Sequence, residues 1–230
     1  MQLKILTSNS TRTVLDALIP AYEKSSGNTV SIAADSAKAM VAKIKAGEAG
    51  DVVILGTGAV KELAEAGIVV PASRRAFARA VVGVGVAKGT PHPDISSVDA
   101  LRKSLLAAKS IAHTLHGASG MYIPTLLEKL GIAAQMKAKT VNRPGGYIGT
   151  VVVAGEAQLA LQQIPELLAV PGLEVVGPLP AEVQKTLETS VGLFSASTQA
   201  AAAQAMIDYF QQPQHAALFK SKGLEQASHS

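Results

Sequence analysis

Short apolar runs with strand character alternate along this chain with longer segments whose apolar residues recur every three or four positions. The run 3–6 is followed by an amphipathic segment over 11–24, and the same pairing of patterns is repeated several times. Such alternation predicts βα units around a largely parallel sheet. The predicted strands cover 3–6, 29–33, 51–55, 80–87, 110–115, 139–142, 158–162, 173–177 and 190–195. The predicted helices cover 11–24, 37–46, 59–66, 97–106, 121–130, 147–154 and most of the chain after 195.

Two extended segments interrupt the regular alternation and predict that the chain passes between two lobes. The first is the strand-like run over 80–87, which contains two glycines, and the second begins near Ser190. We therefore expect an α/β protein with a discontinuous lobe I over 1–82 and 190–230 and a continuous lobe II over 83–189. Ligand sites in such sheets lie beyond the carboxyl ends of strands, so we expect a ligand cleft between the lobes.

Three polar turns each follow a predicted strand in the first third of the chain and each open onto a helix. They cover 8–12, 35–38 and 56–58 and are rich in serine, threonine and glycine. The start of a helix leaves backbone N–H groups unpaired and carries the positive end of the helix dipole. Turns of this kind attract anions. Lobe II supplies comparable turns over 116–120, 144–147 and 162–163.

Composition narrows the class of partner. The 21 lysines and arginines are scattered among 17 acidic residues, for a net charge of +4, and only 3% of residues are aromatic, so a nucleic-acid partner is not expected. Cysteine is absent, which excludes disulfides and thiolate metal sites. No apolar run reaches the roughly 18 residues of a membrane span, so we expect no direct membrane insertion.

The ordered motifs of the chain resemble those of the molybdate-binding-protein-like branch of the type II periplasmic solute-binding proteins. The resemblance extends over essentially the full length and rests on the turns at 8–12 and 36 and on 43–47, 50–53, 120–132, 155–157 and 177–180. It implies a two-lobed type II periplasmic-binding-protein fold with two crossover strands and a central ligand cleft. It also implies a monomer without cofactor or metal that delivers a small anion to the membrane subunits of an ABC-type transporter.

The same resemblance implies ligand contacts at Ser8 or Ser10, at Ser36 and in the turn around Ser119. With the residues in and beside the polar turns, the candidate ligand-binding residues of lobe I are Ser8, Asn9, Ser10, Arg12, Ser36 and Ala37, and those of lobe II are Ser119, Gly146, Tyr147 and Gln163. The molybdate binders carry a tyrosine where this sequence has Gln163, and the run 162–164 is instead similar to a subgroup related to aconitate isomerase. Arg12 and Arg143 would suit a ligand with several carboxylates, because guanidinium groups pair carboxylates bidentately.

Three functions remain open at this point. The protein either binds a small oxyanion or polycarboxylate for transport, or interconverts cis- and trans-aconitate as a cofactor-independent isomerase, or senses a ligand. An isomerase needs a group that moves a proton along the allylic system, for which His116 and Tyr147 are the candidates. The N-terminus shows no export signal, so the location is periplasmic if a leader was removed and cytoplasmic if Met1 is the native start.

Several of these residues also have a purely structural interpretation. Ser36 would stabilise its helix by about 1 kcal/mol as an ordinary N-cap, and capping and anion contact are compatible at one turn. His113 and His116 would point to opposite faces of a strand, which argues against a metal site. The turn 56–58 lacks the third glycine of a dinucleotide fingerprint, so nucleotide binding is not expected.

Overall fold

A computed structural model of the protein describes residues 1–227, and the chain divides into two compact units. Unit 1 comprises 1–79 together with the chain from 188 onward, and unit 2 comprises 80–187. The sequence placed the two crossings near residues 82 and 190. Among the described residues, no helix is both long and apolar enough to cross a membrane.

Unit 1 is built on parallel βα units, as the alternation of patterns predicts. Strand β1 lies between β2 and β3 and runs parallel to both, and β9 joins β3 antiparallel. The strands are β1 (Gln2–Ser8), β2 (Thr29–Asp35), β3 (Val52–Gly56), β9 (Thr186–Leu193) and β10 (Glu225–Gln226). The helices are α1 (Asn9–Ser26), α2 (Ala37–Lys45), α3 (Thr57–Glu65), α9 (Ala200–Phe210) and α10 (Ala216–Ser221).

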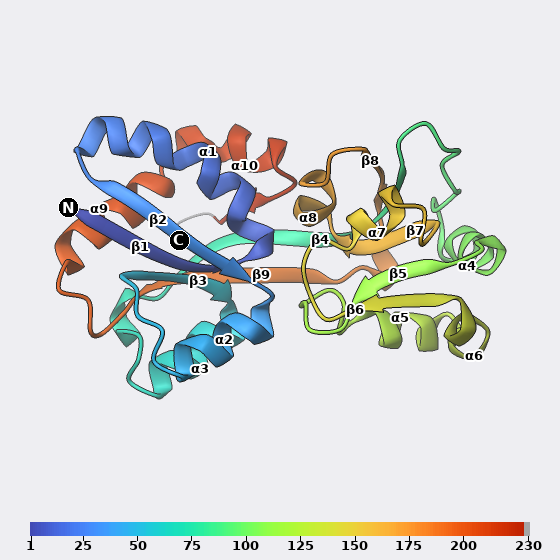
Figure 1. Cartoon of the computed structure of the whole chain (residues 1–230), viewed down its shortest axis with the longest axis horizontal. Coiled ribbons are helices and arrows are strands. Elements are labelled where there is room, and N and C mark those ends of the chain that lie inside the picture. The colour runs from blue at the N-terminus through green and yellow to red at the C-terminus, as the bar shows by residue number, and fades with distance from the viewer. Residues whose placement is uncertain (228–230) are drawn as a thin grey trace. The chain divides into compact units, whose positions relative to one another are not determined.

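Helices cover both faces of the unit 1 sheet (Figure 1). Helices α2 and α3 bury Met40 and Leu63 in a cluster with Val53 of the sheet. Helices α1 and α9 cover the other face, where the rings of Tyr22 and Phe210 meet edge to face at 5.8 Å. The apolar stripe of each helix therefore packs on the sheet and leaves its polar residues outside.

Unit 2 contains the strands that follow β4 in the order β4, β7, β5, β6, with β8 also paired to β4. Strand β5 runs parallel to both of its neighbours. The strands are β4 (Arg75–Ala87), β5 (Ile111–Thr114), β6 (Thr140–Arg143), β7 (Leu159–Gln163) and β8 (Leu173–Pro178). The helices are α4 (Val98–Ala107), α5 (Ile123–Lys129), α6 (Ala133–Met136), α7 (Gly149–Val153) and α8 (Ile164–Leu168). Short 3₁₀ helices cover Pro71–Ser73, Lys137–Lys139, Ala181–Val183 and Pro213–His215.

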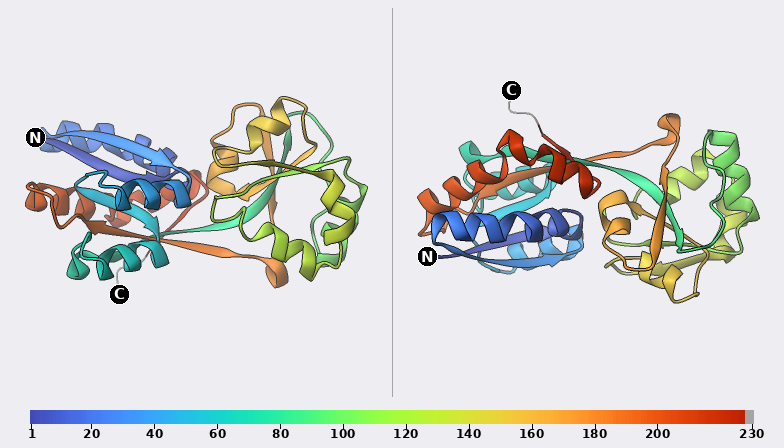
Figure 2. Two further views of the ribbon diagram at one scale, coloured as in Figure 1. Left: turned by 60° about the horizontal axis from the view of Figure 1, so that its bottom comes forward. Right: turned by 90° about the horizontal axis from the view of Figure 1, so that it is seen from above.

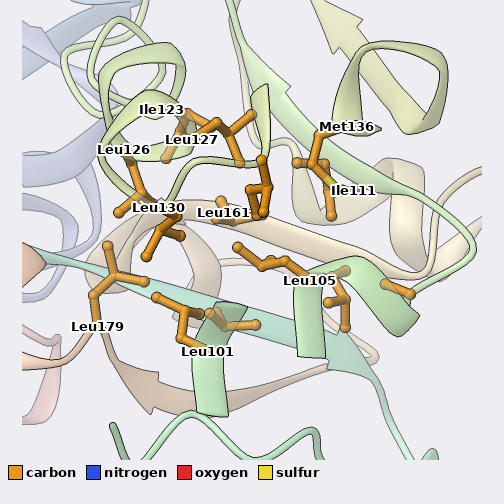
Figure 3. Close-up of a cluster of buried hydrophobic side chains, with 14 of the residues drawn as sticks. Leu101, Leu105, Ile111, Ile123, Leu126, Leu127, Leu130, Met136, Leu161 and Leu179 are labelled. Carbon is orange, nitrogen blue, oxygen red and sulfur yellow. The ribbon is translucent and has the colours of Figure 1, made fainter. Parts of the chain in front are cut away.

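Aliphatic side chains from α4, α5 and the sheet fill the larger core of unit 2 (Figure 3). Leu101 and Leu105 of α4 lie in this cluster with Ile111 and Leu161 of the sheet, and all four are fully buried. Helix α4 begins as the sequence indicates, because the Ser97 hydroxyl accepts the N–H of Ala100 at 3.1 Å. The cap at Ser97 and the burial of Leu101 and Leu105 thus both fix the position of this helix.

Strands β4 and β9 are neighbours in the sheet, and each carries the chain from one unit to the other (Figure 2). Strand β4 begins at Arg75, five residues before the predicted run. This first part carries charged residues, so it lacks an apolar pattern, and it is held in the sheet by pairing with β10. Helix α7 begins at Gly149, two residues later than predicted, and the backbone just before it is bonded to the Gln162 side chain at Gly146 and Ile148.

Gly83 of β4 permits a close approach that any side chain would block. A Cβ at this position would lie 2.8 Å from the carbonyl oxygen of Gly177 and 2.8 Å from Cγ1 of Ile164. Contacts this short require the strand or its neighbours to move. Gly83 is therefore the point where β8 and the start of α8 come close to the crossing strand.

We predict that Gly83→Ala lowers the free energy of unfolding by about 1–3 kcal/mol, because the added methyl group overpacks this contact. The matched control is Gly58→Ala in the first turn of α3, where a Cβ would meet nothing within 4 Å. The control should raise stability by about 0.5–1 kcal/mol through helix propensity. Urea denaturation followed by circular dichroism measures both, and equal effects of the two substitutions would contradict the prediction.

Candidate functional site

The first three helices of unit 1 begin at the same edge of its sheet. Helices α1, α2 and α3 start directly after β1, β2 and β3, which are adjacent and parallel. The register pairs Ser8 with Asp35 and Thr7 with Ile54, so the ends of these strands lie side by side. Three sets of unpaired N–H groups and three positive dipole ends therefore gather at one edge.

The serines at two of these turns do not cap the backbone of the helices that they precede. Within residues 1–227, Ser8 and Ser36 occupy the N-cap positions of α1 and α2, yet neither hydroxyl accepts a hydrogen bond from a backbone N–H of its helix. Ser97, in contrast, caps α4 in the ordinary way, because its hydroxyl accepts the backbone N–H of Ala100. The Ser8 hydroxyl instead lies 3.1 Å from that of Ser10, and Ser8, Ser10 and Ser36 are all buried. These hydroxyls can therefore donate to a bound anion.

Two buried threonines fix the turn between β1 and α1. The hydroxyls of Thr7 and Thr11 are 2.6 Å apart, and the Thr7 hydroxyl donates to the carbonyl oxygen of Ile54 at 2.9 Å. The bond to Ile54 ties the end of β1 to the end of β3. Thr11 belongs to the polar turn 8–12 in the sequence pattern, but in the structure it is fully buried.

Charged side chains around this edge are already paired with one another. The Arg12 Nε lies 2.8 Å from both carboxylate oxygens of Asp16. The carboxylate of Asp35 accepts the N–H of Ser36 at 2.6 Å and a bond from Lys43 at 2.8 Å, and the Lys43 bond lowers the pKa of Asp35. One N–H group at the start of α2 is thus occupied by a carboxylate, which shows that this turn accepts negative charge.

In unit 2, the loop after β5 wraps around a buried threonine. A Cβ on Gly120 would lie 1.9 Å from the carbonyl oxygen of Thr114, and one on Gly117 would lie 2.5 Å from its hydroxyl. Within the described chain, the hydroxyls of Thr114 and Ser119 are both buried without a hydrogen-bond partner. Buried hydroxyls without partners cost free energy, so this loop holds two groups suited to a polar ligand.

Gln162 clamps the glycine turn that precedes α7. Its Nε2 donates to the carbonyl oxygen of Gly146 at 2.8 Å, and its Oε1 accepts the N–H of Ile148 at 2.9 Å. Both ends of this amide are therefore used to hold the backbone on either side of Tyr147. Tyr147 itself is partly buried. The turn 146–148 is positioned by a side chain of the adjacent strand and not by its own sequence alone.

Gln163, the next residue, contacts a buried carboxyl group. Its Nε2 donates to Oε2 of Glu166 at 3.2 Å, and the two residues are only 4% and 5% exposed. Burial raises the pKa of Glu166 to about 8, and hydrogen bonds from Gln163 partly oppose this rise. Glu166 is thus mostly neutral at pH 7.

The two histidines singled out by the sequence lie in different settings. His113 is buried on β5, where its Nδ1 lies 2.9 Å from the carbonyl oxygen of Thr114, and burial lowers its pKa. His116 lies partly exposed in the loop after β5, and its N–H donates to the carbonyl oxygen of Pro144 at 2.9 Å. No group of three or more metal-ligating side chains is found in residues 1–227. Arg143 forms an ion pair with Glu156.

The sequence did not indicate that Thr114 and Glu166 belong to these turns, nor that Gln162 holds the turn 146–148. A signal for Glu166 was present, since a polar residue followed three positions later by Glu at a helix start resembles a capping box. Nothing in the local pattern indicated that this carboxyl is buried. The candidate residues therefore form one group at the edge of the unit 1 sheet and another in the turns after β5, β6 and β7 of unit 2.

Comparison with known proteins identifies relatives over nearly the whole chain. The family model described as bacterial extracellular solute-binding protein matches residues 3–225. An aconitate isomerase from Pseudomonas sp. is 33% identical, and the match covers 97% of this chain and 87% of that protein.

Solved structures with this fold include anion-binding proteins at low sequence identity. The periplasmic molybdate-binding protein of Azotobacter vinelandii superposes with a TM-score of 0.83 at 19% identity, covering 99% of this chain and all of that one. A sulfate-binding protein from Mycobacterium tuberculosis H37Rv gives a TM-score of 0.79 at 18% identity, covering 99% and 88%. With its two lobes, two crossing strands and matching family model, the chain belongs to the bacterial extracellular solute-binding proteins and has their type II periplasmic-binding-protein fold.

Proposed function

We propose that this protein binds a small anion. The observation that carries the proposal is the position of Ser8 and Ser36, whose buried hydroxyls lie at adjacent helix N-termini and do not cap those helices. Charge-assisted hydrogen bonds to an anion would use these hydroxyls together with the backbone N–H groups of Asn9, Ser10 and Ala37. An anion would also stabilise helix dipoles that point the same way.

Unit 2 would contribute hydroxyl, backbone and amide groups. The buried Ser119 hydroxyl has its hydrogen-bonding capacity free, and the glycine turn at Gly146 and Tyr147 is held in place by Gln162. Gln163 adds an amide at the carboxyl end of β7. A neutral amide in this position suits a ligand that carries both acceptor and donor groups, such as a partly protonated or hydroxylated carboxylate.

We propose a polycarboxylate as the ligand class. The relative at 33% identity is named an aconitate isomerase. Arg12 supports this class, because its ion pair with Asp16 uses Nε and both side chains are at least 40% exposed. An exposed pair of this kind is worth only about 0–1 kcal/mol, so a ligand carboxylate can compete for the guanidinium.

The family model also supports a role in uptake. Extracellular solute-binding proteins bind their ligand outside the cytoplasmic membrane and pass it on, so we propose that this chain acts in the periplasm as a monomer with the membrane subunits of an ABC-type transporter. The fold similarity to molybdate- and sulfate-binding proteins supports the same role.

We predict that Ser36→Ala and Ser8→Ala each weaken anion binding at least tenfold, because each removes a buried donor that makes a charge-assisted bond of about 1.5–3 kcal/mol. The measurement is isothermal titration calorimetry with trans-aconitate and with molybdate. Ser97→Ala is the matched control, since Ser97 caps α4 and should lose about 1 kcal/mol of stability with no change in affinity. Unchanged affinity in the folded Ser8 and Ser36 variants would contradict the proposal.

A second candidate function is isomerisation of aconitate, which the 33% identical relative favours. The reaction would remove a proton from the methylene carbon of trans-aconitate and return one at the far end of the allylic system, so that no cofactor is consumed. His116 and Tyr147, both partly exposed in the turns of unit 2, are the candidates for moving this proton. The anion-binding groups would stabilise the negative charge that develops on the carboxylate.

Under this second function, trans-aconitate incubated with the protein in D2O yields the cis isomer at a rate proportional to protein concentration, as followed by proton NMR. We expect His116→Asn or Tyr147→Phe to lower kcat at least a hundredfold, as loss of general acid–base catalysis does. Line broadening of trans-aconitate without any cis isomer would instead leave the protein as a binding protein alone.

A further inference from the structure

Glu166 is a buried carboxyl group that the proposed function does not use. It lies in the first turn of α8, three residues after Gln163, and is 5% exposed. None of the ion pairs found in residues 1–227 includes Glu166. Its hydrogen-bond partner is the Nε2 of Gln163 at 3.2 Å.

A capping role alone does not account for this burial. Gln163 is the N-cap residue of α8, and Glu166 occupies the position from which a capping-box carboxylate reaches back to it. A capping carboxylate works equally well when exposed and ionised, whereas burying a carboxyl group without a cation is costly. Burial of the Glu166 carboxyl group therefore costs free energy that a capping role does not require.

The surroundings of Glu166 leave burial as the dominant influence on its protonation. Helix α8 packs on β7 and β8 and comes close to β4 at Gly83 and Gly85. The charged residues of β4, Arg75 and Arg79, form ion pairs with acidic residues of unit 1. Strand β7 carries no titratable side chain, and the one on β8, Glu174, lies 3.3 Å from His92. Burial raises the pKa of Glu166 to about 8, and only the hydrogen bonds from Gln163 oppose it. Near neutral pH, the carboxyl group therefore keeps its proton.

Two glutamine side chains lie at the end of β7, and Glu166 contacts the one whose amide is not hydrogen-bonded to the backbone. Gln162 is fully engaged with Gly146 and Ile148, whereas Gln163 bonds to the carboxyl group. An ionised Glu166 would place a negative charge in a buried environment one hydrogen bond away from the proposed ligand-binding amide. In such an environment, charge interactions are far stronger than in water.

We propose that Glu166 is a positioning residue that makes anion binding depend on its proton: the carboxyl group holds the Gln163 amide in place, and its ionisation adds a buried negative charge that repels the bound anion. This inference rests on the proposed function of Gln163 as a ligand contact. By linkage, the bound anion must in turn favour the protonated carboxyl group. Binding at alkaline pH then takes up a proton from solution.

We predict that the wild-type protein binds trans-aconitate at least tenfold more weakly at pH 9.5 than at pH 7, since ionisation of Glu166 introduces repulsion. Calorimetry at pH 9 in two buffers of different ionisation enthalpy should show uptake of about half a proton or more per anion bound, as linkage to a tenfold effect requires. Glu166→Gln, which stays neutral, should show neither the pH dependence nor the proton uptake. Glu174→Gln is the matched control and should behave like the wild type, because its carboxylate lies 38% exposed beside His92.

The outcomes separate this inference from the proposed function. An affinity that changes less than threefold between pH 7 and pH 9.5, or no proton uptake in the wild type, overturns the role of Glu166 and leaves anion binding intact. Failure of the wild type to bind trans-aconitate and molybdate at pH 7 overturns the proposed function and the inference with it. Proton uptake by the wild type needs no variant, so it decides the matter even if Glu166→Gln does not fold.

The neutral carboxyl group can also be detected without any ligand. The unfolded chain loses the Glu166 proton near pH 4.5 and the folded protein near pH 8, so the folded state binds the extra proton between these values. Stability from this group is therefore fully present below pH 4.5 and is lost as the pH rises to 8. The melting temperature of the wild type should fall over this range relative to that of Glu166→Gln, and parallel profiles would show that Glu166 is ionised.

Discussion

The parallel pairing of β1 with β2 and β3 is the constraint on which the candidate site in unit 1 depends. Parallel strands end at the same edge, so the helices that follow them also begin there. Thr7 secures this arrangement through bonds to Thr11 and to the carbonyl oxygen of Ile54. Aligned helix N-termini repel one another, and the carboxylate of Asp35 at the start of α2 relieves part of that repulsion. A bound anion would relieve the rest.

Unit 2 supplies polar groups by a different physical route. Its turns are shaped by glycines that allow backbone and side chains to approach closely, as where the loop at Gly120 closes over Thr114. The amide of Gln162 then fixes the turn at Gly146 from the neighbouring strand. A buried polar group without a hydrogen-bond partner raises the free energy of the folded state, and the Ser119 hydroxyl is such a group. A hydrogen bond to a polar ligand would recover this free energy.

The cations near the two groups of candidate residues are held only loosely. Arg12 and Arg143 pair with Asp16 and Glu156 at positions that are 40% or more exposed, where solvent screens the attraction. Such pairs keep the guanidinium groups ordered at little cost. A carboxylate ligand can replace their partners, whereas Glu166, which is buried, can respond only by gaining or losing a proton.

The sequence by itself determined the features that depend on local chemistry. The alternation of apolar patterns predicts the βα units, Ser97 predicts the start of α4, and the polar turns predict where helices open at strand ends. Tertiary structure alone decided which of two adjacent glutamines holds a turn and which meets a carboxyl group, and that Glu166 is buried. Periodicity and capping act within a few residues, whereas strand pairing and burial depend on partners distant in the chain, which no local pattern encodes.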